Sequence, residues 1–300
     1  MFLDLPELLE PNDLIIVNET RVRSARLIGT RVGTGGRVEL LLLERLDGTT
    51  WEALARPARR LRPGVVIEFD GFNVTVTSEP DEGRVTVALD SPDPERAIEH
   101  AGSVPLPPYF TGHLSTSDRY QTMFAADTGS AAAPTAALHF TPEVTKRLNG
   151  RGIALATVDL HVSLDTFRPM AVEQIEDHVM HSEWCSVPAD TAGAVDAARQ
   201  RDGRVVAIGT TVVRALETMA DGSRGVEPGE KRTDLFLTPG SEFSVVDVLV
   251  TNFHLPSSTL LVLLAAFMGD GWRHAYEVAL TRGYRFLSFG DAMLAVRDGS

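Results

Sequence analysis

The periodicity of apolar residues changes once along this 300-residue chain, and that change limits the folds that the chain can adopt. Between about residues 21 and 91, short apolar stretches are separated by turns that contain glycine, which predicts an all-β region. The expected strands are Arg37–Leu46, Trp51–Ala55, Val65–Phe69, Asn73–Thr77 and Arg84–Leu89. Several short strands at such spacing are typical of a small barrel or sandwich.

A proline-rich joint at residues 105–110 separates this region from a longer one in which strands and helices alternate, which predicts an α/β domain. The expected strands are Ile153–Leu160, Val205–Ile208, Asp234–Leu237, Val245–Val250 and Tyr284–Leu287. The expected helices are Val213–Ala220, Ser258–Met268 and Trp272–Leu280. A further buried strand, Leu14–Val17, precedes the all-β region, and the chain is long enough for two domains.

The stretch from Gly129 to Pro142 begins with small residues, so its backbone can lie close to a ligand or to another segment. It ends in Thr141-Pro142-Glu143, which predicts a helix that begins at Pro142 with Thr141 as its N-cap. His139 stands just ahead of that helix, where the positive end of the helix dipole favours a neutral imidazole. Two interpretations are open here, a ligand-binding histidine and a hydrogen-bonded histidine in a tightly packed loop.

Polar residues follow several expected strands, at the sheet edge where α/β folds usually bind their ligands. With His139 they form a ring of His, Thr, Asn and Arg side chains: His161, Arg168, Thr210, Thr211, Arg214, Asn252 and His254. Several such strand ends together favour a binding site over a core. Arg214 and Glu217 also have helical spacing, so a purely structural ion pair is an equal alternative for them.

The run Asp177–Trp184 is the most polar and aromatic in the chain. His178 and His181 could share a metal ion if they lay on a helix, but no third ligand is clustered with them. Acid–base work or substrate positioning is therefore the favoured interpretation. Cys185 has no activating neighbour, which indicates a buried thiol. The sequence has no Walker loop, Rossmann fingerprint or Gly-x-Ser-x-Gly motif, so the usual cofactor signatures are absent.

The chain carries a formal net charge of −13, and its basic residues are almost all arginines. Contacts with phosphates supply most nucleic-acid affinity, so an acidic chain is not an obvious nucleic-acid binder. A local arginine patch can nevertheless hold RNA. Two candidates are Arg21–Arg26 and Arg56–Arg62, and a pair of solvated turns is the alternative interpretation of both.

Three features bear on the compartment. A single cysteine excludes a disulfide framework and indicates a reducing environment. The N-terminal residues include acids and lack the basic stretch of a signal peptide. The longest apolar run, Leu260–Met268, is too short to span a bilayer. We therefore expect a cytoplasmic protein without a membrane segment.

Nine motifs, in order along nearly the whole chain, give the sequence a strong resemblance to the S-adenosylmethionine:tRNA ribosyltransferase-isomerase family of queuosine biosynthesis. They are Pro105-Leu-Pro-Pro-Tyr109, Arg119-Tyr-Gln-Thr122, Ala133-Pro-Thr-Ala-Ala-Leu-His-Phe-Thr-Pro142, Leu160-His-Val162, Thr166-Phe-Arg-Pro169, His181-Ser-Glu-Trp184, Gly209-Thr-Thr211, Thr251-Asn-Phe-His-Leu-Pro256 and Phe289-Gly-Asp-Ala-Met293. Asn18-Glu-Thr-Arg-Val22 also resembles the early motif of the family.

The resemblance implies a discontinuous, barrel-like α/β domain at residues 1–20 and 113–300, with a small β-barrel domain inserted at residues 21–112. It implies a transferase and isomerase that moves the ribosyl part of S-adenosylmethionine onto 7-aminomethyl-7-deazaguanine in tRNA. The product is epoxyqueuosine, and adenine and methionine are released. S-adenosylmethionine is then a substrate, no cofactor is needed, tRNA carrying that base is the partner, and a monomer is expected.

This chemistry needs a base for the proton on C5′, next to the sulfonium, and hydrogen-bond donors for the leaving groups and alkoxides. As a hypothesis, the residues that transfer protons are His139, His161, His181 and His254. The residues expected to bind the substrate are Thr135, Arg168, Glu183, Thr210, Thr211, Arg214 and Asn252. The residues expected to contact tRNA are Arg21, Arg56, Arg59 and Arg119.

The chain also departs from the family pattern. Members usually begin a few dozen residues earlier, so the chain is interpreted as an N-terminally shortened member or a paralogue. Ser257 stands where a lysine is usual, and Ser163-Leu-Asp165 replaces Gly-Leu-Gly. The residues expected to handle S-adenosylmethionine match better than those expected to contact tRNA. Two alternatives stay open: a paralogue that uses a small-molecule acceptor, and a catalytically silent binder of RNA or nucleosides.

Overall fold

The computed structural model describes residues 1–107, 109–110, 116–163, 170–172 and 174–297. The chain separates into two compact units, one of residues 1–21 with 119–300 and the other of residues 22–118. The first unit is α/β and the second is a β-barrel inserted into it, as the resemblance implied. The sequence had suggested junctions at residues 20/21 and 112/113.

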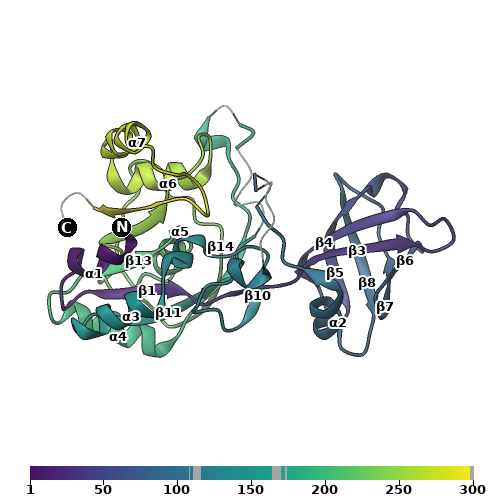
Figure 1. Cartoon of the computed structure of the whole chain (residues 1–300), viewed down its shortest axis with the longest axis horizontal. Coiled ribbons are helices and arrows are strands. Elements are labelled where there is room, and N and C mark those ends of the chain that lie inside the picture. The colour runs from purple at the N-terminus through teal and green to yellow at the C-terminus, as the bar shows by residue number, and fades with distance from the viewer. Residues whose placement is uncertain (108, 111–115, 164–169, 173, 298–300) are drawn as a thin grey trace. The chain divides into compact units, whose positions relative to one another are not determined.

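The inserted unit is a six-stranded antiparallel barrel, which Figure 1 shows with its strands labelled. Its strands are β3 (Arg26–Arg31), β4 (Arg37–Arg45), β5 (Thr50–Arg56), β6 (Val66–Phe69), β7 (Phe72–Val76) and β8 (Arg84–Asp90). They pair in the order β4-β5-β8-β7-β6-β3, and β3 pairs with β4 to close the ring. Alternate residues of each strand fill the barrel, with Trp51 and Leu40 completely buried.

Short elements complete the barrel unit. Helix α2 (Pro94–Ala101) begins where the Asp93 carboxylate accepts a hydrogen bond from the Arg96 amide, and it buries Ile98 against the barrel core. Strand β9 (Gly102–Ser103) pairs with β3, and a 3-10 turn, η2 (Ala58–Arg60), follows β5. Residues 33–36 form a hairpin turn between β3 and β4, which are antiparallel neighbours.

The α/β unit is built on a seven-stranded mixed sheet within the described residues. Its strands are β1 (Leu14–Asn18), β11 (Ala154–Leu160), β12 (Glu183–Val187), β13 (Val205–Ile208), β14 (Gly229–Thr233), β15 (Val248–Asn252) and β16 (Ala292–Val296). They lie in the order β14-β12-β11-β1-β13-β15-β16, and the four central strands are parallel. A two-stranded sheet, β2 (Arg21–Val22) with β10 (Thr128–Ser130), lies where the chain leaves and re-enters the unit.

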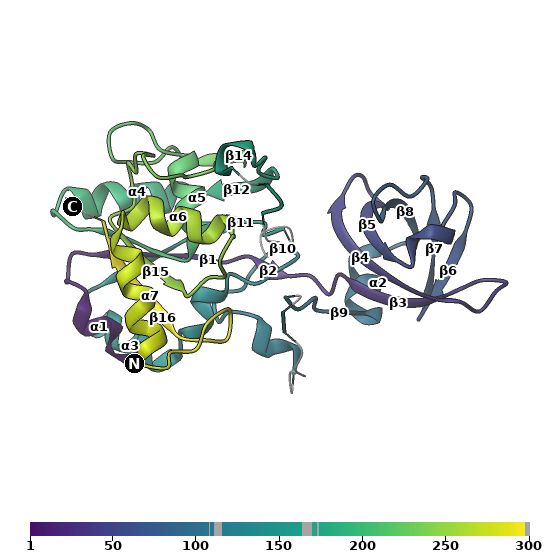
Figure 2. The same ribbon diagram turned by 90° about the horizontal axis from the view of Figure 1, so that it is seen from above.

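Helices cover both faces of this sheet, as Figure 2 shows from above. Helices α1 (Leu5–Leu8) and α3 (Pro142–Gly150) and the 3-10 turn η4 (Thr135–His139) bury one face. Helices α4 (Ala189–Arg199), α5 (Thr210–Thr218), α6 (Thr259–Met268) and α7 (Gly271–Thr281) pack on the other. Further 3-10 turns are η1 (Phe2–Asp4), η3 (Ser117–Tyr120) and η6 (Ile175–Asp177). No helix of the described residues is long and apolar enough to cross a membrane.

Two expected strands were wrong. Residues 234–237 form a loop after β14, and residues 284–287 form a loop before β16. In both loops apolar side chains pack on the main core, and Leu237 is almost fully buried. Because these loops are buried, their sequences contain apolar residues like those of a strand. Strand β12 and helices α2 and α4 were not predicted, because polar residues interrupt their apolar patterns.

The predicted start of α3 is confirmed, because the Thr141 hydroxyl accepts a hydrogen bond from the Val144 amide. We expect Thr141→Ala to lower the free energy of unfolding of the α/β unit by about 1 kcal/mol, since it removes the cap of this helix. Chemical denaturation monitored by circular dichroism measures this. Lys146→Ala, an exposed change on the same helix, is the control and should leave stability unchanged. Equal losses in both variants would contradict the role of the cap.

Candidate functional site

The parallel strands β1, β11, β13 and β15 all end at one edge of the sheet. The antiparallel strands β12 and β16 begin at that edge, with Glu183 and Ala292. The predicted residues that follow or begin strands are therefore brought to a common edge: His161, Glu183, Thr210, Thr211, Asn252 and His254. Neighbouring strands are about 5 Å apart, so β11 and β15 place their residues in two groups about 15 Å apart.

The group at β15 is a hydrogen-bonded chain of three predicted residues. The Thr135 hydroxyl donates to the Asn252 side-chain oxygen at 3.0 Å, and the Asn252 side-chain nitrogen lies 3.2 Å from His139 Nε2. Because that nitrogen can only donate, Nε2 accepts and the His139 proton resides on Nδ1. The turn η4 and the end of β15 are thus connected through side chains. The sequence predicted all three residues but not their contacts.

His139 is held in its neutral form. The ring of Phe2 stacks on it with 5.0 Å between the centroids. Burial lowers the pKa of His139 below its ordinary value of 6.5, outweighing the opposite influence of Asp291, and Arg285 acts in the same direction as burial. A cavity of about 500 Å³ opens beside the ring, lined among others by Phe2, Tyr284 and Asp291. A ligand in this cavity would therefore meet an uncharged imidazole at neutral pH.

His254 lies two residues beyond β15 and is enclosed by protein. Its Nε2 atom is 2.9 Å from the Thr251 hydroxyl, and its backbone amide donates to the Tyr276 hydroxyl at 2.7 Å. Burial lowers the pKa of His254 to about 4 and raises the pKa of Tyr276 to about 12. The contacts of His254 fix the loop that follows Asn252.

The group at β11 centres on His161. Its Nε2 atom lies 3.3 Å from a carboxylate oxygen of Asp159, and its ring is 4.4 Å from that of Trp184. A Cβ atom at Gly129 would fall 2.0 Å from the same Nε2 atom, so a larger residue there would displace the His161 ring from this position. The other ring nitrogen, Nδ1, is therefore the one that a ligand could reach. Burial raises the pKa of the neighbouring Glu19 carboxyl, and the charge of Asp159 acts in the same direction.

Glu183 and Arg214 form a buried ion pair. The Glu183 carboxylate also accepts a hydrogen bond from the Ser163 amide, and Arg214 donates to the carbonyls of Leu235 and Thr233. The alternative in which Arg214 pairs with Glu217 is wrong. The Glu217 carboxylate instead accepts hydrogen bonds from three backbone amides, those of Ser244, Val245 and Val246. Helical spacing did not reveal that the partner of Arg214 lies 31 residues away in sequence.

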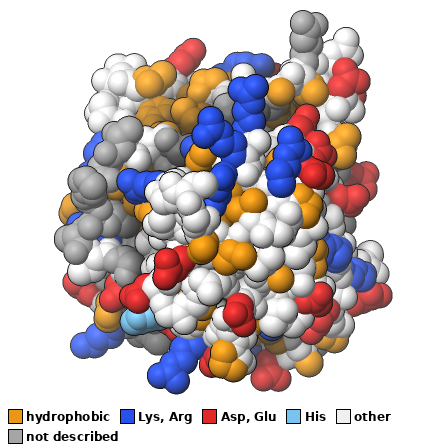
Figure 3. Space-filling model, turned by 90° about the vertical axis from the view of Figure 1, so that its right-hand side faces the viewer, with side chains coloured by type: hydrophobic (Ala, Val, Ile, Leu, Met, Phe, Trp, Pro, Cys, Tyr) orange, Lys and Arg blue, Asp and Glu red, His pale blue; other side chains and the backbone are white. Residues whose placement is uncertain are grey.

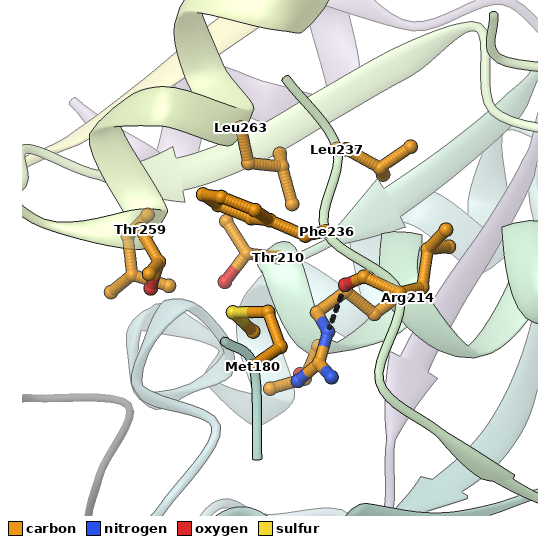
Figure 4. Close-up of a pocket in the computed structure, with 10 residues that line it drawn as sticks. Met180, Thr210, Arg214, Phe236, Leu237, Thr259 and Leu263 are labelled. Atoms are coloured by element: carbon orange, nitrogen blue, oxygen red, sulfur yellow. Dashed lines mark hydrogen bonds between the residues drawn. The ribbon is translucent and has the colours of Figure 1, made fainter. Parts of the chain in front are cut away.

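Thr210 and Thr211 begin helix α5 and line a small pocket that Figure 4 shows in close-up. Labelled around it are Thr210, Thr259, Phe236, Met180 and Leu263, and a dashed line marks the hydrogen bond of Arg214 to the Leu235 carbonyl. Apolar side chains form most of the wall. This pocket lies at the end of β13, between the group at β15 and the group at β11.

The remaining predicted residues lie elsewhere or are not described. His181 is exposed and precedes β12, in a segment that is not helical, so the helical spacing considered for a metal does not apply. No group of three His, Cys, Asp or Glu side chains in the described part of the chain could hold a metal ion. Cys185 is buried, and burial raises the pKa of its thiol. Arg168 lies outside the described residues.

The arginines expected to contact tRNA are divided between the two units. Arg56 and Arg59 are exposed at the end of β5 and on η2 in the barrel unit. Arg119 is exposed on η3 in the α/β unit, and Arg21 is half-buried in β2. Figure 3 shows one face of the molecule on which basic side chains gather in the upper half among acidic ones.

Sequence reasoning missed Asp159, Gly129 as a neighbour of His161, and Phe2. Asp159 precedes the Leu160-His-Val motif by one residue, and alternation along β11 places Asp159 and His161 on the same face of the sheet. That spacing of two was the available signal for the pair. Nothing in the sequence indicated the contact of Phe2 with His139, because the two residues lie 137 positions apart.

Comparison with known proteins shows the family of this chain. The model of the queuosine biosynthesis protein family matches residues 1–295. An S-adenosylmethionine:tRNA ribosyltransferase-isomerase of Symbiobacterium thermophilum is 50% identical over 98% of this chain and 87% of its own length. One of Moorella thermoacetica is 49% identical with the same coverage. The crystal structure of the S-adenosylmethionine tRNA ribosyltransferase of Thermotoga maritima, 35% identical, matches 97% of this chain and 85% of its own with a TM-score of 0.51.

An α/β sheet edge that gathers histidines, an amide and threonine hydroxyls offers groups of the kinds that can move protons and bind a polar substrate. The relatives bear the names of transferase-isomerases, and the chain is an enzyme of this kind. It belongs to the queuosine biosynthesis protein family.

The buried His254 predicts a dependence of stability on pH. The unfolded chain binds a proton on this ring near pH 6.5, whereas the folded chain does so near pH 4, so stability falls as the pH falls through that window. The shifted pKa of His254 contributes about 3 kcal/mol to the free energy of unfolding above this pH window. We expect His254→Gln to flatten the decline of the free energy of unfolding between pH 6.5 and pH 4.

The measurement is urea denaturation at a series of pH values. A uniform loss of stability in the variant does not affect this comparison, because the slope against pH is the readout. His274→Gln is the control, since the side chain of His274 is 82% exposed. An unchanged slope in His254→Gln would show that His254 does not titrate in this window.

Proposed function

We propose that this enzyme transfers the ribosyl part of S-adenosylmethionine to 7-aminomethyl-7-deazaguanine in tRNA and isomerises it, forming epoxyqueuosine and releasing adenine and methionine. The observation that carries the proposal is the chain of Thr135, Asn252 and His139, which holds a neutral imidazole beside a cavity. The names of relatives that are about 45–50% identical support the same reaction.

The sulfonium of S-adenosylmethionine acidifies the proton on its neighbouring C5′ atom, so the first step needs a base that is unprotonated at physiological pH, such as a neutral histidine or a carboxylate. His139 meets this requirement because burial lowers its pKa. Its Nε2 lone pair is directed at Asn252, so a substrate must displace that amide before Nε2 can accept the proton. The Asn252 amide and the Thr135 hydroxyl then remain as hydrogen-bonding groups for the ribose.

His161 is the second group suited to proton transfer, because Asp159 and Gly129 confine its Nε2 atom and leave Nδ1 for the substrate. His254 is enclosed, so we assign it to holding the loop that carries Asn252. Arg214 and Glu183 neutralise each other, and we assign them to supporting the strand end on which the substrate binds. We also propose that Arg168 binds the substrate and that His181 transfers protons, as the sequence predicted.

The proposed tRNA contacts are Arg21, Arg56, Arg59 and Arg119. Arg56 and Arg59 are the most suitable of these, because both are exposed on neighbouring elements of the barrel unit. The ion pairs recorded in that unit, such as Arg26 with Glu39 and Arg84 with Glu52, involve other arginines. An exposed guanidinium group that is not in such an ion pair can bind a phosphate without first breaking a contact with a carboxylate.

The first experiment measures adenine release from S-adenosylmethionine, with tRNA carrying the aminomethyl base and without it. We expect release with that tRNA alone, and we expect His139→Asn to reduce kcat by a factor of ~100 or more, as loss of a general base usually does. His274→Asn, an exposed histidine on α7, is the matched control.

Other outcomes would redirect the proposal. Release without tRNA in the presence of a small amine would indicate a small-molecule acceptor, and no release under any condition would indicate a silent binder. Full activity of His139→Asn would remove His139 from the reaction. A pH profile of kcat/KM that shifts in Phe2→Ala, which uncovers one face of the ring, would further support the role of His139.

The double variant Arg56→Gln/Arg59→Gln tests the tRNA contact. We expect weaker tRNA binding at low salt and a shallower dependence of log Kd on log salt, by about one to two phosphate contacts. Filter binding at several salt concentrations measures both quantities. Arg84→Gln, which lies in a surface ion pair of the same unit, is the control. An unchanged salt dependence in the double variant would place the tRNA elsewhere.

A further inference from the structure

Helix α5 begins without a side-chain cap. Its N-cap residue is Gly209, and within the described residues no side chain caps it; the Val212 amide donates to the Gly209 carbonyl, which leaves the amides of Thr210 and Thr211 at the helix start. Gly209 has a φ of 97°, a conformation that side chains rarely adopt, and its own amide donates to the Val250 carbonyl at 2.8 Å. The free amides and the helix dipole together make this end of α5 attractive to an anion.

The hydroxyl of Thr211 supplies a second, independent observation. Thr211 is 8% exposed and lines the pocket at the start of α5. Its Oγ1 atom is buried and has no hydrogen-bond partner among the residues that the structure describes. Buried hydroxyl groups in folded proteins are almost always hydrogen-bonded, so an unpaired one beside a pocket indicates a missing partner. A ligand with an acceptor atom would supply that partner.

The walls of the pocket limit what the ligand can be. They are formed mainly by apolar side chains, and Figure 4 shows Phe236 and Met180 on either side of Thr210, with Leu263 beyond them. The enclosed space is only about 20 Å³, and it opens to solvent between these side chains. Only a small terminal group can enter it, and an unbranched apolar chain attached to that group would lie along the apolar mouth. A phosphodiester would bring its polar sugar substituents against the apolar walls, which disfavours the RNA backbone here.

Arg214 also lines the pocket but does not offer its charge to a ligand. Its guanidinium group is shared between the Glu183 carboxylate and the carbonyls of Leu235 and Thr233. The anion must therefore be held by backbone amides and hydroxyls. A carboxylate suits this arrangement, because its two oxygens can accept from the amides at the helix start and from the Thr211 hydroxyl together.

We propose that the pocket at the start of α5 binds the carboxylate end of the methionyl part of S-adenosylmethionine, with the Thr211 hydroxyl as one of its donors. The methylene groups of this part would lie along Met180, and its sulfonium would lie near the ring of Phe236, because a cation close to an aromatic face is favoured. The inference rests on the proposed function, because it assigns one part of that substrate to one subsite. The neighbouring strand β15 carries Asn252, so the ribose would be directed toward the chain of Thr135, Asn252 and His139.

The test compares two ligands and three proteins. Isothermal titration calorimetry measures Kd for S-adenosylmethionine and for its decarboxylated analogue, with the wild type, Thr211→Val and Thr218→Val. Valine keeps the shape of threonine and removes the hydroxyl. Thr218 lies on the same helix, and its hydroxyl is paired with that of Thr233 at 2.6 Å, so it serves as the control.

The wild type should bind S-adenosylmethionine at least ~10-fold more tightly than the decarboxylated analogue. Thr211→Val should weaken binding of S-adenosylmethionine by about 10-fold and leave binding of the analogue unchanged. Thr218→Val should show the same ratio of the two Kd values as the wild type. Thermal denaturation of each variant confirms that it is folded before the titrations are compared.

Two results would overturn the inference. One is a wild type that binds both ligands equally, and the other is a Thr211→Val variant that weakens both to the same degree. In either case, intact binding and adenine release would leave the proposed function standing. A wild type that binds neither ligand and releases no adenine would instead overturn the proposed function together with this subsite.

Discussion

A single buried amide, that of Asn18, holds together the edge of the sheet on which the candidate site depends. Its nitrogen donates to the Leu160 carbonyl at 2.9 Å, and its oxygen accepts from the amides of Leu160 and Thr20. Thr20 continues the connection, because its hydroxyl lies 2.8 Å from that of Ser130, which in turn accepts from Val162. Only a side chain that both donates and accepts can join β1 to β11 in this way, so a carboxylate or an apolar residue could not replace it. The chain leaves the α/β unit and re-enters it beside this network.

Burial, rather than any single charged partner, sets the protonation of the histidines at β15. The pKa of His139 and that of His254 both fall because the rings are removed from water. The two rings nevertheless differ in what they can do. His139 borders a cavity, whereas His254 is closed in by Thr251 and Tyr276. The same physical cause therefore acts on one ring that borders a cavity and on one ring that supports the loop after Asn252.

Local chemistry was predictable from the sequence, and long-range partners were not. Thr141 caps its helix as its position indicated, because a cap depends on residues three positions away. Periodicity also gave β13 at Val205–Ile208 with the correct bounds. The partner of Arg214 could not be found this way, since Glu183 belongs to a strand that the pattern did not reveal. The same holds for Phe2 on His139, whose contact depends on how η1 packs on the finished sheet.

The geometry of Gly209 shows how the fold and the candidate site constrain each other. Strand β13 must end and helix α5 must begin within one residue, and a φ of 97° makes that turn possible. The same φ disfavours any residue with a side chain at this position, so Gly209 provides no side-chain cap for the first amides of α5. A hydroxyl that capped the helix would stabilise it but would occupy the position where an anion can bind. The uncapped start of α5 is therefore a cost to stability that is explained if a substrate group completes the helix.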